Sequence, residues 1–175
     1  MQSPQRVFGK DRTKYLIVNQ TLQFQNRTLY FLVFSGALFL VGTALGPGLF
    51  GNVSIPFISW QFDVFHLLCH QDPERSFFIN GSQMAVCSRC LGIYSFFLIG
   101  WTLIPLIAKL MNIKSRYYFR FLIGTIILNL IDVLGNLFQV WTNTNESRLF
   151  LGALFGLSSA LILSNEFFKK LNTED

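Results

Sequence analysis

The sequence predicts an all-α, polytopic membrane protein with four transmembrane helices and a structured outer loop between the first and second spans. Hydrophobic residues make up 51% of the chain and charged residues only 13%, whereas about a quarter of the residues in a soluble domain are charged. Four apolar stretches come close to the ~20 residues that a helix needs to cross the hydrocarbon core. Lysines and arginines gather in alternate connections between these stretches, as they do in loops on the cytoplasmic side.

The four expected spans cover residues 29–50, 91–111, 119–141 and 149–168. In the first span, Gly46-Pro47-Gly48 removes a backbone donor and adds flexible residues, so we expect the helix to stop or kink there. No signal-peptide pattern precedes this span, so we expect it to be retained. The chain then divides into a polar, basic N-terminal tail (1–28), a membrane domain (29–168) with its outer loop (52–90), and a C-terminal tail (169–175).

The distribution of positive charge predicts the orientation. Of the 14 lysines and arginines, all but Arg75, Arg89 and Arg148 lie in the two tails, or in the link between the second and third spans and the span ends that flank it. The positive-inside rule therefore places both termini in the cytoplasm and the outer loop on the external side of a cell (inner) membrane. The net charge of +5 follows from this topology. Because nucleic-acid binding needs a basic face on a folded domain, we expect no such partner.

The outer loop is long for a connection without structure of its own, which indicates a functional or ordered segment. Residues 55–68 are apolar with interspersed polar side chains, too short and polar for a span, and indicate a helix that lies in the interface or dips into the bundle. Pro73 then interrupts the helical pattern. Asn80-Gly81 is typical of a turn that joins two short strands.

All three cysteines and both histidines of the chain lie between residues 66 and 90. Zinc prefers tetrahedral sulfur and nitrogen ligands, which two separate pairs commonly supply. Cys87 and Cys90, two residues apart, form one pair, and Cys69 belongs to the other. The spacing alone leaves either His66 or His70 as the fourth ligand, and it predicts a zinc site of three cysteines and one histidine.

Two other interpretations of the cysteines stay open. Cys87 and Cys90 begin the second span, where the helix dipole and nearby Arg89 would stabilise a thiolate, as in a redox-active dithiol. Buried cysteines also serve as small apolar residues. A purely structural disulfide is disfavoured, because it would leave Cys69 unpaired in an oxidising space.

The third span carries polar side chains on one helical face, at Asn129, Asp132, Asn136 and Gln139. Such residues must face the bundle interior or a wet cavity, and an intramembrane carboxylate is a candidate functional group. We expect Asp132 to pair with Arg148 or Arg89. In the fourth span, Gly152 and Gly156 form a groove of small residues for close helix packing.

These residues resemble the prokaryotic integral membrane proteins of domain of unknown function family 2085. The resemblance rests on Cys69-His70-Gln71, on Pro73-Glu74-Arg75-Ser76-Phe77, and on the segment from Val86-Cys87-Ser88-Arg89-Cys90 to Tyr94. A second motif of that family is similar to Asp132, Gln139, Thr144-Asn145, Arg148 and Gly152. The resemblance implies a multi-pass membrane protein and favours His70 over His66 as the nitrogen ligand. It implies no activity.

The first hypothesis is an outer-facing zinc site of Cys69, His70, Cys87 and Cys90 beside a polar intramembrane pocket. Asp132, Arg89 and Arg148 are its candidate catalytic residues, with Asp132 as a proton carrier or as the group that orients an arginine; the other pocket residues are Gln71, Arg75, Gln139 and Asn145. The pocket suits an anionic or phosphate-bearing lipid headgroup or an anionic small molecule, since arginine binds such groups bidentately. The second hypothesis is a quinone-linked thiol-disulfide oxidoreductase that uses Cys87 and Cys90. The third is a small transporter or binding component.

Overall fold

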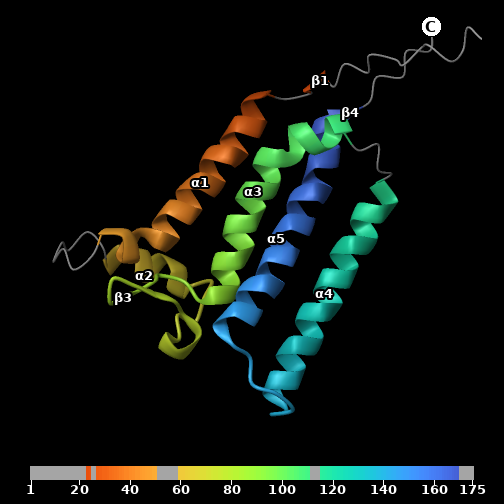
Figure 1. Ribbon diagram of the computed structural model, residues 1–175. Coiled ribbons are helices and arrows are strands. Elements are labelled where there is room, and N and C mark those ends of the chain that lie inside the picture. Colours follow the sequence, from red (N-terminus) through yellow and green to blue (C-terminus); the bar gives the residue numbers. More distant parts are fainter. Residues whose placement is uncertain (1–22, 25–26, 51–58, 111–114, 170–175) are drawn as a thin grey trace, which may run out of the picture.

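The chain folds mostly into helices that lie side by side (Figure 1). The computed structural model describes residues 23–24, 27–50, 59–110 and 115–169. Within these ranges, only the backbone is described for residues 23–24, 47, 50, 59, 104–110, 115–116 and 164–169. Four long helices are present: α1 (Arg27–Phe50), α3 (Ser88–Leu110), α4 (Ser115–Leu137) and α5 (Asn145–Phe167). The most extensive packing joins α3 to α5, while α1 lies against α3 and α4 against α5.

Within the described residues, three helices are long and apolar enough to cross a membrane. The qualifying segments are Arg27–Gly46 of α1, Tyr117–Leu137 of α4 and Asn145–Leu163 of α5. Many large apolar side chains on them are exposed, such as Leu32 at 63% and Leu130 at 55%. A water-soluble protein would hide such residues, whereas hydrocarbon solvates them.

Neighbouring contacts show how the helices alternate in direction. The Tyr30 hydroxyl donates to the Trp101 carbonyl (3.1 Å), and the Trp101 indole donates to the Tyr30 carbonyl (3.2 Å), so the start of α1 lies beside the far half of α3. The two-residue strands β1 (Gln23–Phe24) and β4 (Phe168–Lys169) pair antiparallel, next to the start of α1 and the end of α5. Both described ends of the chain therefore lie at the same end of the bundle.

Helices α3 and α5 run parallel and touch through glycines. Close packing at Gly152 and Gly156 is what their spacing predicts. A Cβ atom at Gly152 would lie 2.1 Å from the Arg89 carbonyl oxygen, and one at Gly156 would lie 2.2 Å from the Ile93 carbonyl oxygen. The contacts are reciprocal, since a Cβ at Gly92 would meet the Leu149 carbonyl oxygen at 2.3 Å. Only glycine allows the two backbones to approach this closely. The N-termini of both helices consequently lie at the same end of the bundle.

The connection between α1 and α3 is folded where it is described. It contains α2 (Ser59–His66), the 3₁₀ turn η1 (Pro73–Arg75), and the strands β2 (Phe78–Ile79) and β3 (Ser82–Gln83). Asn80 and Gly81 join the two strands with φ of 52° and 78°, the left-handed pair that a tight hairpin turn requires. The expected hairpin is confirmed. Within the stretch 55–68, where a helix is expected, the structure has the shorter α2, and residues 51–58 lie outside the described part of the chain.

Helix α1 ends at Phe50, the expected end of the first span, and it does not stop at Gly46-Pro47-Gly48. The absent side chains at these glycines make room for the loop, because a Cβ at Gly46 would lie 2.7 Å from the Gln61 amide and one at Gly48 would lie 2.7 Å from Ile79 Cβ. Helix α4 ends at Leu137 rather than near residue 141. The basic N-terminal tail, except residues 23–24 and 27–28, lies outside the described residues, as does the C-terminal tail after 169.

Candidate metal centre and arginine cavity

The structure brings the three cysteines together. Their sulfur atoms all lie within 4.8 Å of one another, and all three are free thiols. Cys69 follows the end of α2, where its amide donates to the Phe65 carbonyl (2.8 Å), and Cys87 and Cys90 flank the first residues of α3. Donors that are 18 residues apart in the chain therefore share one point in space.

The loop is fastened in a way that brings Cys69 to the start of α3. The Gln71 side-chain amide donates both to the Phe62 carbonyl (2.7 Å) and to the Ala85 carbonyl (3.0 Å). It thereby joins the segment that carries Cys69 to the segment that leads into Cys87. Gln71 itself takes a positive φ of 53°, which turns the chain directly after His70.

The electrostatics of the cluster favour a thiolate. The Cys87 backbone amide donates to the Cys69 sulfur at 3.1 Å. Hydrogen bonds from the Cys87 and Cys90 thiols lower the pKa of Cys69 to about 2, and the same bond with Cys69 raises the pKa of Cys87. The thiolate is the form that binds metals and that attacks disulfides.

One member of the cluster, Cys69, is shielded from water by apolar side chains, whereas Cys87 and Cys90 are partly exposed. Cys69 is 4% exposed and packs in one buried group with Ala44, Phe65, Ala85 and Val86. Such a shell excludes solvent and strengthens the electrostatic interactions of a bound ion with its ligands.

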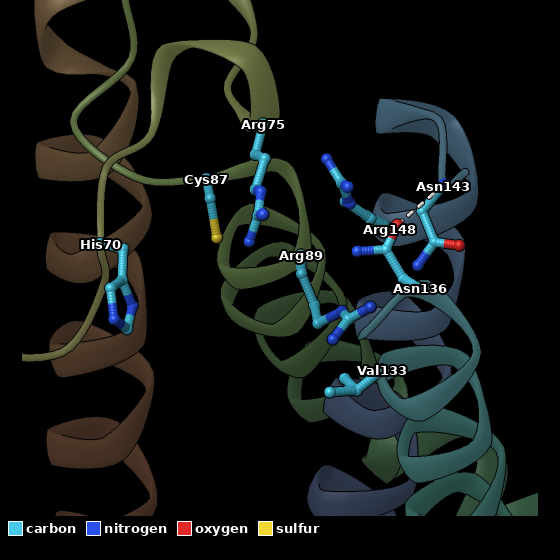
Figure 2. A pocket seen from close by; sticks show the side chains of 8 residues that line it. All are labelled: His70, Arg75, Cys87, Arg89, Val133, Asn136, Asn143 and Arg148. Atoms are coloured by element: carbon cyan, nitrogen blue, oxygen red, sulfur yellow. Dashed lines mark hydrogen bonds between the residues drawn. The ribbon is translucent and has the colours of Figure 1, made fainter. Parts of the chain in front are cut away.

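Neither histidine belongs to the cluster. His66 and His70 are both exposed, and the group of mutually close donor atoms contains only the three cysteines among the described residues. His70 lies at the edge of the cavity that Cys87 also lines, and in Figure 2 its ring lies on the opposite side of Cys87 from Arg89 and Arg148. The structure thus places three of the four expected ligands together, with His70 nearby.

A cavity of about 330 Å³ lies beside the cluster, where the outer loop meets the ends of α3, α4 and α5. It is rich in positive and amide side chains; its lining residues are His70, Arg75, Cys87, Arg89, Val133, Asn136, Asn143 and Arg148. In Figure 2 the arginines reach into this space from three segments: η1, α3 and α5. Among the described residues, a hollow with this lining therefore lies at the end of the bundle.

The three arginines differ in how they are paired. Arg89 forms an ion pair with Asp132, whose Oδ2 also accepts a hydrogen bond from the Asn143 amide (2.7 Å). Arg75 pairs with Asp72 in η1, at 3.1 Å between Nε and Oδ2, in a partly exposed position. Arg148 has no ion pair or side-chain hydrogen bond among the described residues. Of the two expected partners for Asp132, the structure selects Arg89.

The remaining predicted pocket residues, Gln71, Asn145 and Gln139, do not line the cavity. Asn145 accepts a hydrogen bond from the Ser88 hydroxyl and donates to the Ser76 carbonyl, both at 3.4 Å, which ties the starts of α3 and α5 to the loop. Gln139 is exposed in the turn after α4, with a φ of 57°. Because α4 has already ended, Gln139 does not share the face of Asp132.

Sequence reasoning missed one contributor to this site. Asn143 fastens Asp132 through its side chain and, through its backbone amide, bonds the Asn136 side chain (3.3 Å, dashed in Figure 2). It lies in an irregular turn, where no helical or strand periodicity marks it. Asn136 lines the cavity and is one of the polar face residues of the third span that the sequence singles out.

Comparison with known proteins gives relatives without an assigned activity. The sequence pattern of the family described as "Predicted membrane protein (DUF2085)" matches residues 69–162. The uncharacterized protein MJ1492 of Methanocaldococcus jannaschii is 37% identical over 112 residues, which cover 63% of this chain and 70% of that protein. An uncharacterized protein of Methanothermobacter thermautotrophicus is 53% identical over 30 residues, 17% of this chain and 27% of that protein. No solved structure matches the chain. The matched family segment contains the three cysteines and all the residues that line the cavity.

Proposed function

Because the chain belongs to the predicted membrane protein family DUF2085, we propose that it is a four-span protein of the cell membrane that binds a zinc-type metal ion at the external end of its bundle. In this proposal α3, which corresponds to the second expected span, crosses the membrane together with α1, α4 and α5. It has 23 residues and lies between α1 and α5, two helices that are themselves long and apolar enough to cross. A helix that packs between two spanning helices crosses the same thickness of hydrocarbon as they do.

The observation that carries the metal site is the convergence of the three cysteine sulfurs within 4.8 Å. Zinc–sulfur bonds of about 2.3 Å in a tetrahedron separate neighbouring sulfurs by about 3.8 Å, so small side-chain rotations suffice to close the site. His70 supplies the fourth ligand in this proposal. It is next to Cys69 in a loop segment, and its imidazole is exposed and without a competing hydrogen bond among the described residues.

The charge distribution supports the orientation. Arg75, Arg89 and Arg148 all gather at the cavity end of the bundle. The other end carries the starts of α1 and α4 and the end of α5, which bring most of the positive charge that flanks the spans. The positive-inside rule then assigns the cavity and the cysteines to the external side and both termini to the cytoplasm.

The cavity is the proposed binding site for an anionic lipid or small molecule. Arg89 and Arg148 would contact the ligand. Asp132 acts as a positioning residue rather than a proton carrier, because its carboxylate is already engaged by Arg89 and Asn143. In this proposal, any reaction of the ligand is carried out by the groups that line the cavity and not by Asp132.

A second candidate function is thiol-disulfide exchange, which the lowered pKa of Cys69 favours. A disulfide between Cys69 and one of the paired cysteines would release two electrons and two protons to a quinone, the acceptor in this alternative. Reduction of the disulfide would restore the three free thiols.

Elemental analysis separates the two functions. The protein is purified in detergent without chelator, and metal is measured in the wild type, Cys69→Ser, Cys87→Ser, Cys90→Ser and His70→Ala, with His66→Ala as the matched control. We expect stoichiometric metal in the wild type and His66→Ala, and its loss in each cysteine variant. Metal-free protein whose thiol count rises on mild reduction would establish the redox function instead.

A further inference from the structure

We infer that the cavity lined by Arg75, Arg89 and Arg148, here called the arginine cavity, is a phosphate-binding site. Arg148 makes the principal contact with the bound group. Arg75 moves to cover it, and Arg89 contacts it from a fixed position. The inference rests on the proposed function, in which the cavity takes an anion, and it names the chemistry of that anion. A phosphate group carries several oxygen acceptors, and planar guanidinium groups bind these bidentately.

The charges around the cavity favour an anion. Three guanidinium groups line it, and among the described residues two carboxylates form ion pairs with them, Asp132 with Arg89 and Asp72 with Arg75. Arg148 is partly buried and has no acceptor among the described residues. The Arg89 Nε is likewise buried without a hydrogen-bond partner. Buried donors without partners are costly, and a bound oxyanion satisfies them.

The two existing ion pairs give the arginines different freedom. The pair of Arg89 with Asp132 is largely enclosed, with side chains 24% and 13% exposed. Asp132 is also fixed by Asn143, so Arg89 keeps its position. The pair of Arg75 with Asp72 has side chains 54% and 36% exposed. Because such exposed pairs contribute little, Arg75 can exchange Asp72 for a ligand at small cost.

The position of the cavity suits phosphate in two further respects. The parallel helices α3 and α5 both begin there, at Ser88 and Asn145, and the positive ends of their dipoles add to the field of the arginines. The cavity also lies where the apolar segments of α4 and α5 end or begin, at Leu137 and Asn145. This is the level of the bilayer at which lipid headgroups are found.

The size of the cavity limits the ligand. A volume of about 330 Å³ is at the lower end of small-molecule sites. It accommodates a phosphate group with a small substituent, whereas the acyl chains of a lipid would remain outside among the exposed apolar side chains of α4. Phosphate can therefore come from a lipid headgroup or from a soluble ion.

Calorimetric titration of the full-length protein in neutral detergent tests the site. The probes are inorganic phosphate, a short-chain phosphatidic acid, and acetate at matched ionic strength. Arg148→Gln and Arg75→Gln are compared with Arg120→Gln, which removes an exposed arginine on α4 at the opposite end of the bundle. We expect the wild type and Arg120→Gln to bind the phosphate probes and not acetate, with affinity at least about tenfold weaker in Arg148→Gln. Tighter binding of phosphatidic acid than of phosphate would identify the lipid as the source, and equal binding would identify the free ion.

Three results would overturn the inference: acetate bound as tightly as phosphate, no phosphate binding by the wild type, or equal losses in Arg148→Gln and Arg120→Gln. Thermal unfolding and metal content are measured on the same samples, and Arg148→Lys replaces Arg148→Gln if the latter unfolds. Absence of phosphate binding from a protein with full metal content would refute this site and leave the proposed metal centre standing. Phosphate binding by a protein that is purified without metal would support this site and refute the proposed metal centre.

Discussion

Replacing Gly152 with alanine should separate α3 from α5 at the point where both approach the cavity. The added Cβ would lie 2.1 Å from the Arg89 carbonyl oxygen, a backbone atom that no side-chain rotation can move. Nonbonded heavy atoms pack at about 3.5 Å or more, so the helices must move apart by roughly 1 Å. The same movement shifts the turn that carries Cys87, Arg89 and Cys90.

The cost of this change follows from overpacking. Inserting a methyl group into a closely packed contact typically costs about 1–3 kcal/mol. For a chain of 175 residues, each kcal/mol corresponds to a fall in Tm of about 2–4 °C. Gly124→Ala is the matched control, because a Cβ at Gly124 in α4 meets nothing within 4 Å. It should leave the Tm unchanged or raise it slightly, since alanine favours the helix.

Thermal unfolding of the two variants in the same detergent provides the assay, with metal content as a second readout. We expect Gly152→Ala to unfold at a lower temperature and to retain less metal than Gly124→Ala. Equal unfolding temperatures would refute the close parallel contact of α3 and α5. Loss of stability with full retention of metal would show that the contact does not position the cysteines.

Three further predictions follow from the same structure. Asp132→Ala should lower the free energy of unfolding by about 1–3 kcal/mol, because it leaves the Arg89 charge unpaired; thermal denaturation showing no loss would mean that the pair is not formed. In a background without native cysteines, Asn80→Cys should react with a membrane-impermeant thiol reagent from outside the cell and Arg120→Cys should not, and the opposite pattern would reverse the proposed orientation. Removing the metal with a chelator should weaken phosphate binding, since the two paired cysteines bracket Arg89; calorimetric titration giving the same affinity would show that the two sites are independent.

Features with a local cause could be predicted from the sequence. The hairpin between β2 and β3 follows from Asn80-Gly81, whose residues readily take a positive φ. Close packing of α5 follows from the four-residue spacing of Gly152 and Gly156, which places both on one face. The cysteine cluster was predicted from the shortness of its spacing and the scarcity of thiols elsewhere.

Features that depend on where a helix ends could not be predicted in the same way. Hydropathy continues to Trp141, but the chain turns back after Leu137, and a Cβ at Gly135 would lie 2.0 Å from the Trp141 ring. This reversal takes Gln139 off the face of Asp132 and brings Asn143 onto it. It depends on a contact between side chain and helix that no local pattern encodes.

The position of His70 is the other feature that sequence spacing left open. Adjacency to Cys69 constrains its backbone, but the ring direction depends on the turn at Gln71 and on any bound ion. The three thiols converge without its help.

X-ray absorption at the metal edge of the detergent-purified protein tests the central claim most directly, because it counts the donor atoms around the ion. The account predicts three sulfur ligands at about 2.3 Å and one nitrogen ligand at about 2.0 Å, with the nitrogen signal lost in His70→Ala. A shell with fewer than three sulfurs, or one unchanged by Cys69→Ser, would contradict it.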